Sequence, residues 1–459
     1  MSDTAPQSAD TAPAHPLLSA AGQQRLDAIC HTPLRRGNQV ILLASGAESY
    51  RYRRALLDKA KVSIHIVAFS LMRDSTSFGL RDVLLEKLRQ GVEVKLILDD
   101  AVMWSTFSGG IVRELQQAGA QTIRYHQLFH NILPDWSQGN PFRQLIRIFK
   151  LKLKRRYHEK YMVIDGTEVV LGGINWGNKY AYGGIKPKAW RDSDAYITGP
   201  VVSDIQRQFH KDFNRYLVMN DYLSQDLGST LPEQATQSTV PENPVTGEDN
   251  IRYVAHKPYD DNELVMTNAY LQVIREAQNY IYWGCHGIRP PNVIAGALAE
   301  AVQRGVDVRL YTNSKQASRT LMLWGLMGWM YTESHRHFYG LLSRGIRVFE
   351  WQKPGAFHSK NMVIDDVFAS VGSYNIARGS AFHHTESNIF VTSGAFQLQV
   401  KKQFMIDEQD CREIKLDEVK PPSAYHDPFR RKLNPRNRLI REGLLPDALK
   451  QTLSTTGED

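Results

Sequence analysis

An α/β fold made of two similar halves is predicted by the sequence of 459 residues. Three observations support this prediction. β-rich runs alternate with amphipathic segments, this alternation occurs twice along the chain, and a polar stretch separates the two copies. Strands that alternate with helices at this spacing are typical of α/β units around a mostly parallel sheet.

The repeat extends over three consecutive units in each copy. The runs RQGVEVKLIL and QRGVDVRLYT show the similarity most clearly. The matching units are residues 62–69 with 279–285, 92–100 with 306–314, and 115–125 with 341–351. Because such self-similarity marks a repeated architecture, each copy is expected to form one structural unit.

The polar stretch and the limits of the repeat suggest where the units begin and end. Residues 223–250 are rich in Ser, Thr, Pro and Gln, which is the composition of a linker. We therefore expect five segments: a polar N-terminal segment (1–37), a first lobe (38–222), a linker (223–250), a second lobe (251–412) and a basic C-terminal tail (413–459).

Composition indicates a globular chain with a mild positive charge. Hydrophobic residues make up 42% and charged residues 23%, and the net charge is +8. An anionic partner is therefore plausible, although a charge this small could serve solubility alone. The three cysteines fit neither a disulfide framework nor a metal knuckle. Neither a signal peptide nor a membrane-spanning helix is expected, because the first residues are polar and the apolar runs are too short to cross a bilayer.

One short motif occurs in both copies, with the same internal spacing. In the first copy, His158, Lys160 and Asp165 precede an apolar run and then Asn175. The second copy repeats this order with His358, Lys360, Asp365 and Asn375. Residues i and i+2 of a strand share a face, so each histidine should point to the same side as its lysine.

These residue types suit phosphoryl transfer. Such a reaction needs cations and donors around the phosphate oxygens, a nucleophile, and an acid for the leaving oxygen. The lysines and asparagines are suitable donors, while one histidine can be the nucleophile and the other the acid. No cluster has convincing metal-ligand spacing, so neither a metal nor another cofactor is expected.

Two further carboxylates align downstream of the motifs. Residues 191–198 match 385–392, which places Asp192 opposite Glu386. We expect each carboxylate to hydrogen-bond the far ring nitrogen of a histidine and so to fix its tautomer. Asp165 and Asp365 stand at a strand end, where holding a turn is as good an explanation as catalysis.

With these motifs the sequence resembles the phospholipase D superfamily, whose signature is His-x-Lys-x4-Asp followed by Gly-Ser/Gly-x-Asn. Within it, GGINWGNKY and WRDSDAYITGPVV look like bacterial cardiolipin synthases and related phosphatidyltransferases. The resemblance implies two α/β/α lobes with pseudo-two-fold symmetry, a site at their interface and a phosphohistidine intermediate. It also implies that His158 is the nucleophile and His358 the acid. Gly173 stands where the second copy has Ser373, so one substrate-binding hydroxyl is missing from the first copy.

The resemblance implies a phosphatidyltransferase that acts on glycerophospholipids in bacteria, in the cytoplasm or at the cytoplasmic face of the inner membrane. The alternatives are a phospholipase D that uses water and a nuclease, although no nucleic-acid-binding module is recognisable. Residues 142–156 (FRQLIRIFKLKLKRR) could lie on an anionic membrane or form a solvated basic helix. Residues 321–331 could line an acyl-chain channel or form a buried helix.

Overall fold

The computed structural model describes residues 15–125, 154–219, 240, 242–261, 263–317, 324–392 and 394–421, without the side chains of 104–105, 218–219 and 324–330. Most of the basic insertion, the linker and the C-terminal tail therefore lie outside the described residues. The same holds for the start of the N-terminal segment and for the side chains of nearly all of the apolar run.

The first half contains strands and helices in alternation, as the sequence predicts. Its strands are β1 (Arg35–Leu43), β2 (Ser63–Ala68), β3 (Glu93–Asp99), β4 (Gln121–Tyr125), β5 (Arg156–Tyr157), β6 (Tyr161–Ile164), β7 (Glu168–Gly172) and β8 (Asp194–Thr198). Its helices are α2 (Gly46–Lys59), α3 (Ser75–Arg89), α4 (Asp100–Ser105), α5 (Gly109–Gln117), α7 (Asn178–Ala181) and α8 (Val201–Met219), preceded by η1 (Pro16–Leu18) and α1 (Ala20–Cys30).

The second half repeats this order. Its strands are β9 (Asp249–His256), β10 (Tyr280–Gly284), β11 (Asp307–Asn313), β12 (Arg347–Trp351), β13 (Met362–Ile364), β14 (Phe368–Gly372), β15 (His384–Val391) and β16 (Cys411–Ile414). Its helices are α9 (Val265–Glu276), α10 (Asn292–Gln303), α11 (Trp324–Leu342), α12 (Arg378–Phe382), α13 (Phe396–Glu408) and η3 (Leu416–Glu418).

The two halves form one continuous sheet. Its order is β16-β12-β11-β10-β13-β14-β15-β9-β1-β8-β7-β6-β2-β3-β4, and the antiparallel pair β1·β9 joins the halves. Apart from β16, the order reads the same outwards from this pair, with β8 matching β15 and β2 matching β10. The predicted α/β fold is confirmed. Within the sheet, β2–β3–β4 and β10–β11–β12 pair in parallel, and the other neighbouring strands pair antiparallel. The sheet is therefore mixed and mainly antiparallel rather than mostly parallel, because antiparallel strands join the two parallel groups at the centre.

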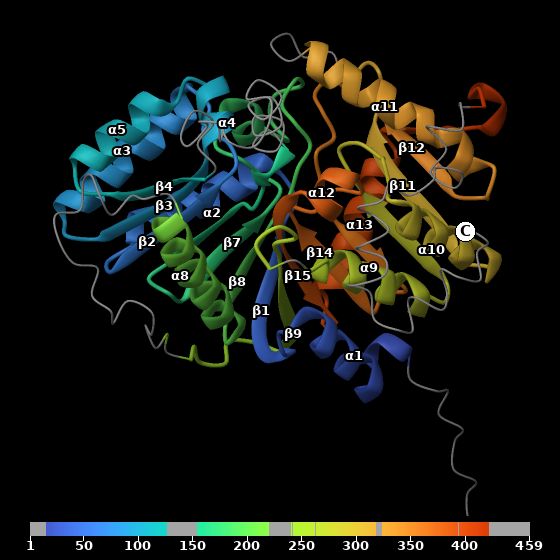
Figure 1. Ribbon diagram of the computed structural model, residues 1–459, viewed down its shortest axis with the longest axis horizontal. Helices are drawn as coiled ribbons and strands as arrows, with labels where there is room; N and C mark the ends of the chain where they lie inside the picture. The colour runs from blue at the N-terminus through green and yellow to red at the C-terminus, as the bar shows by residue number, and fades with distance from the viewer. Residues whose placement is uncertain are drawn as a thin grey trace, which may run out of the picture.

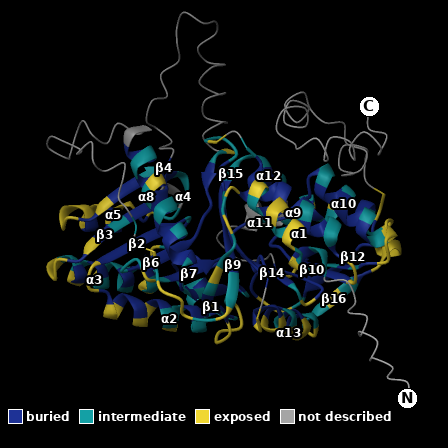
Figure 2. Cartoon of the chain, turned by 90° about the horizontal axis from the view of Figure 1, so that it is seen from below, coloured by how far each residue is buried: buried dark blue, intermediate teal, exposed yellow. Residues whose placement is uncertain are grey.

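Helices cover both faces of the sheet (Figure 1). In the first half, α2, α3 and α5 pack on one face, and α8 packs on the other. In the second half, α9 and α10 cover one face and α13 the other. Figure 2 shows that the strands are mostly buried while the helices expose their outer sides. Strand β2 is buried along its whole length, in keeping with a sequence rich in Ile and Val.

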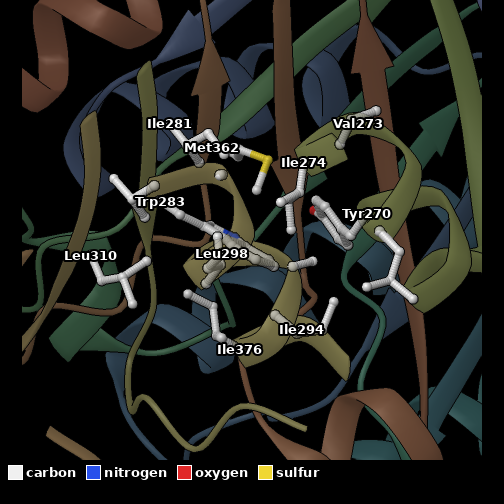
Figure 3. Packing of buried hydrophobic residues seen from close by; sticks show 14 of the residues in the cluster. Tyr270, Val273, Ile274, Ile281, Trp283, Ile294, Leu298, Leu310, Met362 and Ile376 are labelled. Carbon is white, nitrogen blue, oxygen red and sulfur yellow. The ribbon is translucent and has the colours of Figure 1, made fainter. Parts of the chain in front are cut away.

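Side chains from both halves share one of the apolar cores. This core joins Phe209 and Phe213 of α8 to Phe396 and Phe404 of α13. A second core, shown in part in Figure 3, lies between the other face of the second-half strands and α9 and α10, with Trp283 at its centre. Because the shared core spans the junction, the two halves form one packed body.

The N-terminal helix α1 precedes the first half but packs against α9 of the second half. Arg252 of β9 is fully buried and donates to the carbonyl oxygens of Gln23 and Thr32 and to the carboxylate of Asp27. The chain therefore crosses between the halves before β1. None of the helices in the described part of the chain has the length and apolar character to cross a membrane.

Candidate active site

The two motif histidines lie at the junction, and each is held by the main chain of the opposite half. The N–H of His158 donates to the carbonyl of Thr385 at 3.1 Å, next to the short parallel pairing of β5 with β15. In the same way, the N–H of His358 donates to the carbonyl of Arg191 at 2.7 Å. These bonds bring each histidine beside the carboxylate that follows in the other half.

Each histidine is hydrogen-bonded to that carboxylate through Nδ1. Nδ1 of His158 lies 2.8 Å from Oε2 of Glu386, and Nδ1 of His358 lies 2.6 Å from Oδ2 of Asp192. When the carboxylate is ionised it only accepts, so in that state Nδ1 carries the hydrogen and Nε2 keeps its lone pair. Each histidine is thus paired with a carboxylate from the other half of the chain. The alignment of Asp192 with Glu386 did not show which histidine each carboxylate binds.

Equivalent polar groups fix the residue before each histidine. The carboxylate of Asp99, at the end of β3, accepts from the N–H of Tyr157 at 2.9 Å. In the second half, Oδ1 of Asn313, at the end of β11, accepts from the N–H of Phe357 at 2.6 Å. The carboxyl ends of the central parallel strands thus position both motifs, which is where open α/β sheets bind ligands.

Both motif lysines are buried and close to both histidines. Nζ of Lys160 donates to the carbonyl of His158, and Nζ of Lys360 donates to that of His358 and lies 2.9 Å from Nδ1 of the same ring. Burial lowers the pKa of Lys160 to about 7 and also lowers that of Lys360. The two ammonium charges act on each other across the junction, which indicates a single site.

Burial also shifts the histidines and their carboxylates. It lowers the pKa of His158 and His358 well below the usual range, and the nearby lysine charges lower it further. It raises the pKa of Asp192 to about 7 and also raises that of Glu386. Both imidazoles are therefore neutral at pH 7, so each can offer a lone pair at Nε2.

The two carboxylates have different surroundings, which follow from the pair Gly173 and Ser373. Ser373 Oγ donates to Glu386, and so does Ser380 Oγ. At Gly173 a Cβ atom would stand 2.3 Å from Oδ1 of Asp192, so the glycine leaves room for that carboxylate. The hydroxyl that is missing from the first copy is thus replaced by space for Asp192. Both residues contact the carboxylates that hold the histidines.

The predicted asparagines lie beside the site but point to other groups. Oδ1 of Asn175 accepts from the N–H of Ser70 at 3.0 Å, and its Nδ2 donates to the hydroxyl of Tyr180 at 3.0 Å. Oδ1 of Asn375 lies 3.6 Å from Sγ of Cys285. Neither side chain is hydrogen-bonded to a motif histidine within the described residues. Both keep the loop after their strand in place.

Asp165 and Asp365 are not brought to the histidines. The carboxylate of Asp165 accepts from the N–H groups of Lys61, Val62 and Ser63, between 2.8 and 3.2 Å away. Asp365 accepts in the same way from the backbone of residues 278–280. Both aspartates have positive φ angles, of 51° each. This geometry favours the turn-holding interpretation, because both carboxylates satisfy the start of a neighbouring strand.

Several aromatic residues near the histidines were not predicted as part of the site. Tyr180, Trp190 and His286 surround His358, with ring centroids 5.5, 5.2 and 5.1 Å from it. Phe69 and His384 adjoin His158, at 4.7 and 5.7 Å. A signal for two of them was available, because the aligned runs WRDSD and HTESN place Trp190 opposite His384.

One group near His158 has the residue types of a metal site. Possible ligand atoms of His158, His384 and Glu386 lie within 4.8 Å of one another. The Glu386 carboxylate already accepts hydrogen bonds from His158, Ser373 and Ser380. A cation would have to displace these donors, so the residues fit a hydrogen-bonded histidine better than a metal ligand set.

A duplicated α/β fold whose crossed histidine–carboxylate pairs lie at the junction defines a phospholipase D-like protein. Residues 54–217 and 270–407, more than half of the chain, match the family described as "Cardiolipin synthase, PLD-like domain". The chain belongs to this family, and the resemblance to the phospholipase D superfamily is confirmed.

Known relatives agree with this assignment. The chain is 28% identical over 372 residues to cardiolipin synthase 2 of Bacillus cereus, covering 81% of this chain but only 65% of that protein. It is 26% identical over 396 residues to cardiolipin synthase A of Pseudomonas entomophila, covering 86% and 74% of the two chains. Its fold is similar to that of phosphatidylserine synthase from Haemophilus influenzae, with a TM-score of 0.61 at 14% identity over 94% and 96% of the chains.

Proposed function

We propose that this protein is a phosphatidyltransferase of cardiolipin-synthase type, which acts on glycerophospholipids through a covalent phosphohistidine. The pair of neutral histidines carries this proposal. Each has Nδ1 bound to a carboxylate, and two ammonium groups lie beside them. The names of the relatives in two bacterial species support a lipid substrate.

In the first step, Nε2 of one histidine attacks the phosphorus of a phospholipid. The bond from phosphorus to the headgroup oxygen breaks, and that oxygen takes a proton from Nε2 of the other histidine. Lys160 and Lys360 neutralise the non-bridging oxygens. The negative phosphodiester raises the proton affinity of the acid histidine, which burial otherwise keeps neutral. When the phospholipid binds, this histidine takes up from solvent, at Nε2, the proton that it then donates to the leaving oxygen.

In the second step, the hydroxyl of an acceptor attacks the same phosphorus. The P–N bond breaks, a P–O bond forms, and the hydroxyl proton passes to the histidine that had acted as acid. In line with the family resemblance, we assign His158 as the nucleophile and His358 as the acid and base. Their carboxylates, Glu386 and Asp192, stabilise each imidazolium as it forms.

The same intermediate could be released by water, which would make the protein a phospholipase D that forms phosphatidic acid. A nuclease is the third possibility. The relatives' names favour lipid over nucleic acid. We also propose peripheral attachment to an anionic membrane, at the cytoplasmic face in a bacterium, through the basic insertion. The end of that insertion that the structure describes places Arg155 over the ring of Tyr259, 3.8 Å from its centroid.

Lipid product analysis tests the proposal. Purified protein with phosphatidylglycerol should yield cardiolipin and glycerol by mass spectrometry, and His158→Ala and His358→Ala should abolish both. Phosphatidic acid alone would identify a hydrolase, and turnover of single-stranded DNA without lipid turnover would identify a nuclease. A phosphatidyl group trapped on His158 in the His358→Ala protein, with no more than one glycerol released per protein, is the expected intermediate. Undiminished activity in His158→Ala would contradict the catalytic assignment.

A further inference from the structure

Two donors in the surroundings of His358 lack an acceptor among the residues that the structure describes. Nζ of Lys179, on α7, lies 3.8 Å from the centroid of the Trp190 ring and 5.3 Å from that of Tyr180. Within the described residues it takes part in no ion pair or hydrogen bond. Trp190 is only 4% exposed, and its indole N–H is buried without a hydrogen-bond partner.

These donors are close to the reacting groups but are not part of the histidine pairs. The Trp190 ring lies 5.2 Å from that of His358 and stacks on His286 at 5.8 Å. The charge of Lys179 reaches His286, where it helps to lower the pKa to about 3. The Trp190 ring therefore contacts both Lys179 and His358.

An ammonium in this position is costly unless an anion joins it. Burial lowers the pKa of Lys179 to about 8, and contact with an aromatic face compensates only in part for lost hydration. The acidic charge that acts on Lys179 is that of Asp74, whose carboxylate is already hydrogen-bonded to backbone N–H groups. This carboxylate caps α3 and accepts from the N–H of Asn178 at 2.8 Å. An ammonium beside an unbonded N–H is a suitable pair of donors for a phosphate.

We propose that Lys179 and the indole N–H of Trp190 bind the phosphate of the acceptor glycerophospholipid, an inference that rests on the proposed function. Joining two phospholipids brings two phosphates into one site. The first reacts between the histidines. The second undergoes no bond change, so it needs donors but no nucleophile or acid. It must also lie close to His358, which takes the proton from the acceptor's hydroxyl.

The test compares two acceptors that draw on one intermediate. Wild type and Lys179→Gln are given phosphatidylglycerol in mixed micelles with 1-propanol, and cardiolipin, phosphatidylpropanol and phosphatidic acid are quantified together. Propanol carries no phosphate. We expect the ratio of cardiolipin to phosphatidylpropanol to fall at least about tenfold, the effect of losing a charged hydrogen-bond partner. Lys179→Arg should keep a higher ratio than Lys179→Gln, because arginine is also a cationic donor. Trp190→Phe should lower the ratio by a smaller factor than Lys179→Gln does.

A matched control is Lys186→Gln. Lys186 also lies over an aromatic ring, that of Tyr182 at 3.6 Å, but it is exposed, so its ratio should equal that of wild type. An unchanged ratio in Lys179→Gln, whether or not total turnover falls, overturns this inference while the proposed function stands. A wild-type protein that forms only phosphatidic acid with either acceptor overturns both.

Discussion

Replacing Glu386 by glutamine should inactivate the enzyme without unfolding it. Glu386 accepts hydrogen bonds from Nδ1 of His158 and from the hydroxyls of Ser373 and Ser380. Ser373 donates to Oε2 and Ser380 to Oε1, so the NH2 group of glutamine would replace one of these acceptors, and at the Oε2 position it would face Nδ1. His158 would turn to the tautomer that carries its hydrogen on Nε2, and the nucleophilic lone pair would be lost.

The expected loss is large. Loss of the hydrogen bond from Nδ1 of His158 to the charged carboxylate costs about 1.5–3 kcal/mol. If His158 keeps its hydrogen on Nδ1, the NH2 group of the glutamine loses its acceptor, at a similar cost. Together these give about 4 kcal/mol, or roughly a 10³-fold fall in kcat. Initial rates of phosphatidylglycerol turnover measure it, with thermal unfolding as the check on folding. Glu93→Gln is the matched control, because Glu93 also bonds a histidine, His65 at 2.8 Å, outside the site. More than about a tenth of wild-type kcat in Glu386→Gln would refute the reasoning.

Three further predictions follow from the same geometry. Gly173→Ser makes the two copies alike, yet its Cβ would stand 2.3 Å from Oδ1 of Asp192; kcat should fall at least about tenfold, and a wild-type kcat would show that the carboxylate can move aside. Asp165→Asn should lower the midpoint of urea unfolding by weakening bonds to three N–H groups while kcat stays within about threefold; a hundredfold loss of kcat would support a catalytic role instead. The pH profile of kcat/KM should peak near pH 7. Asp192 takes up a proton as the pH falls through about 7, and Lys160 loses a proton as the pH rises through about 7. A flat profile between pH 5 and 9 would contradict these pKa shifts.

Features set by short stretches of sequence could be predicted. The strands β2, β3, β10 and β11 lie within the runs that their β-rich composition indicated. The duplicated motif also led to Asp192 and Glu386, because an alignment of the two copies carries residue roles from one half to the other. A repeat thus supplies information that a single motif of three residues lacks.

Features set by contacts between distant segments could not be predicted. The exchange of carboxylates between the halves depends on the pairing of β5 with β15, and nothing in the local spacing of His158 or His358 specifies a partner in the other half. The surroundings of His358 come from segments that lie apart in the sequence: helix α7 with Tyr180, the segment of Trp190 and that of His286. The position of α1 on the second half likewise depends on tertiary packing.

The hydrogen-bonded junction of β1 with β9 limits how substrates can reach the histidines. In many two-lobed enzymes a hinge lets the lobes swing apart, so that the active site opens and closes with each turnover. Here a swing would break the ladder between β1 and β9, the shared apolar core and both crossed histidine–carboxylate pairs at once. For the function proposed above, this means that the catalytic groups stay assembled and that lipids would enter and leave past the rim of one packed body. The order of the two half-reactions would then depend on which acceptor occupies the site.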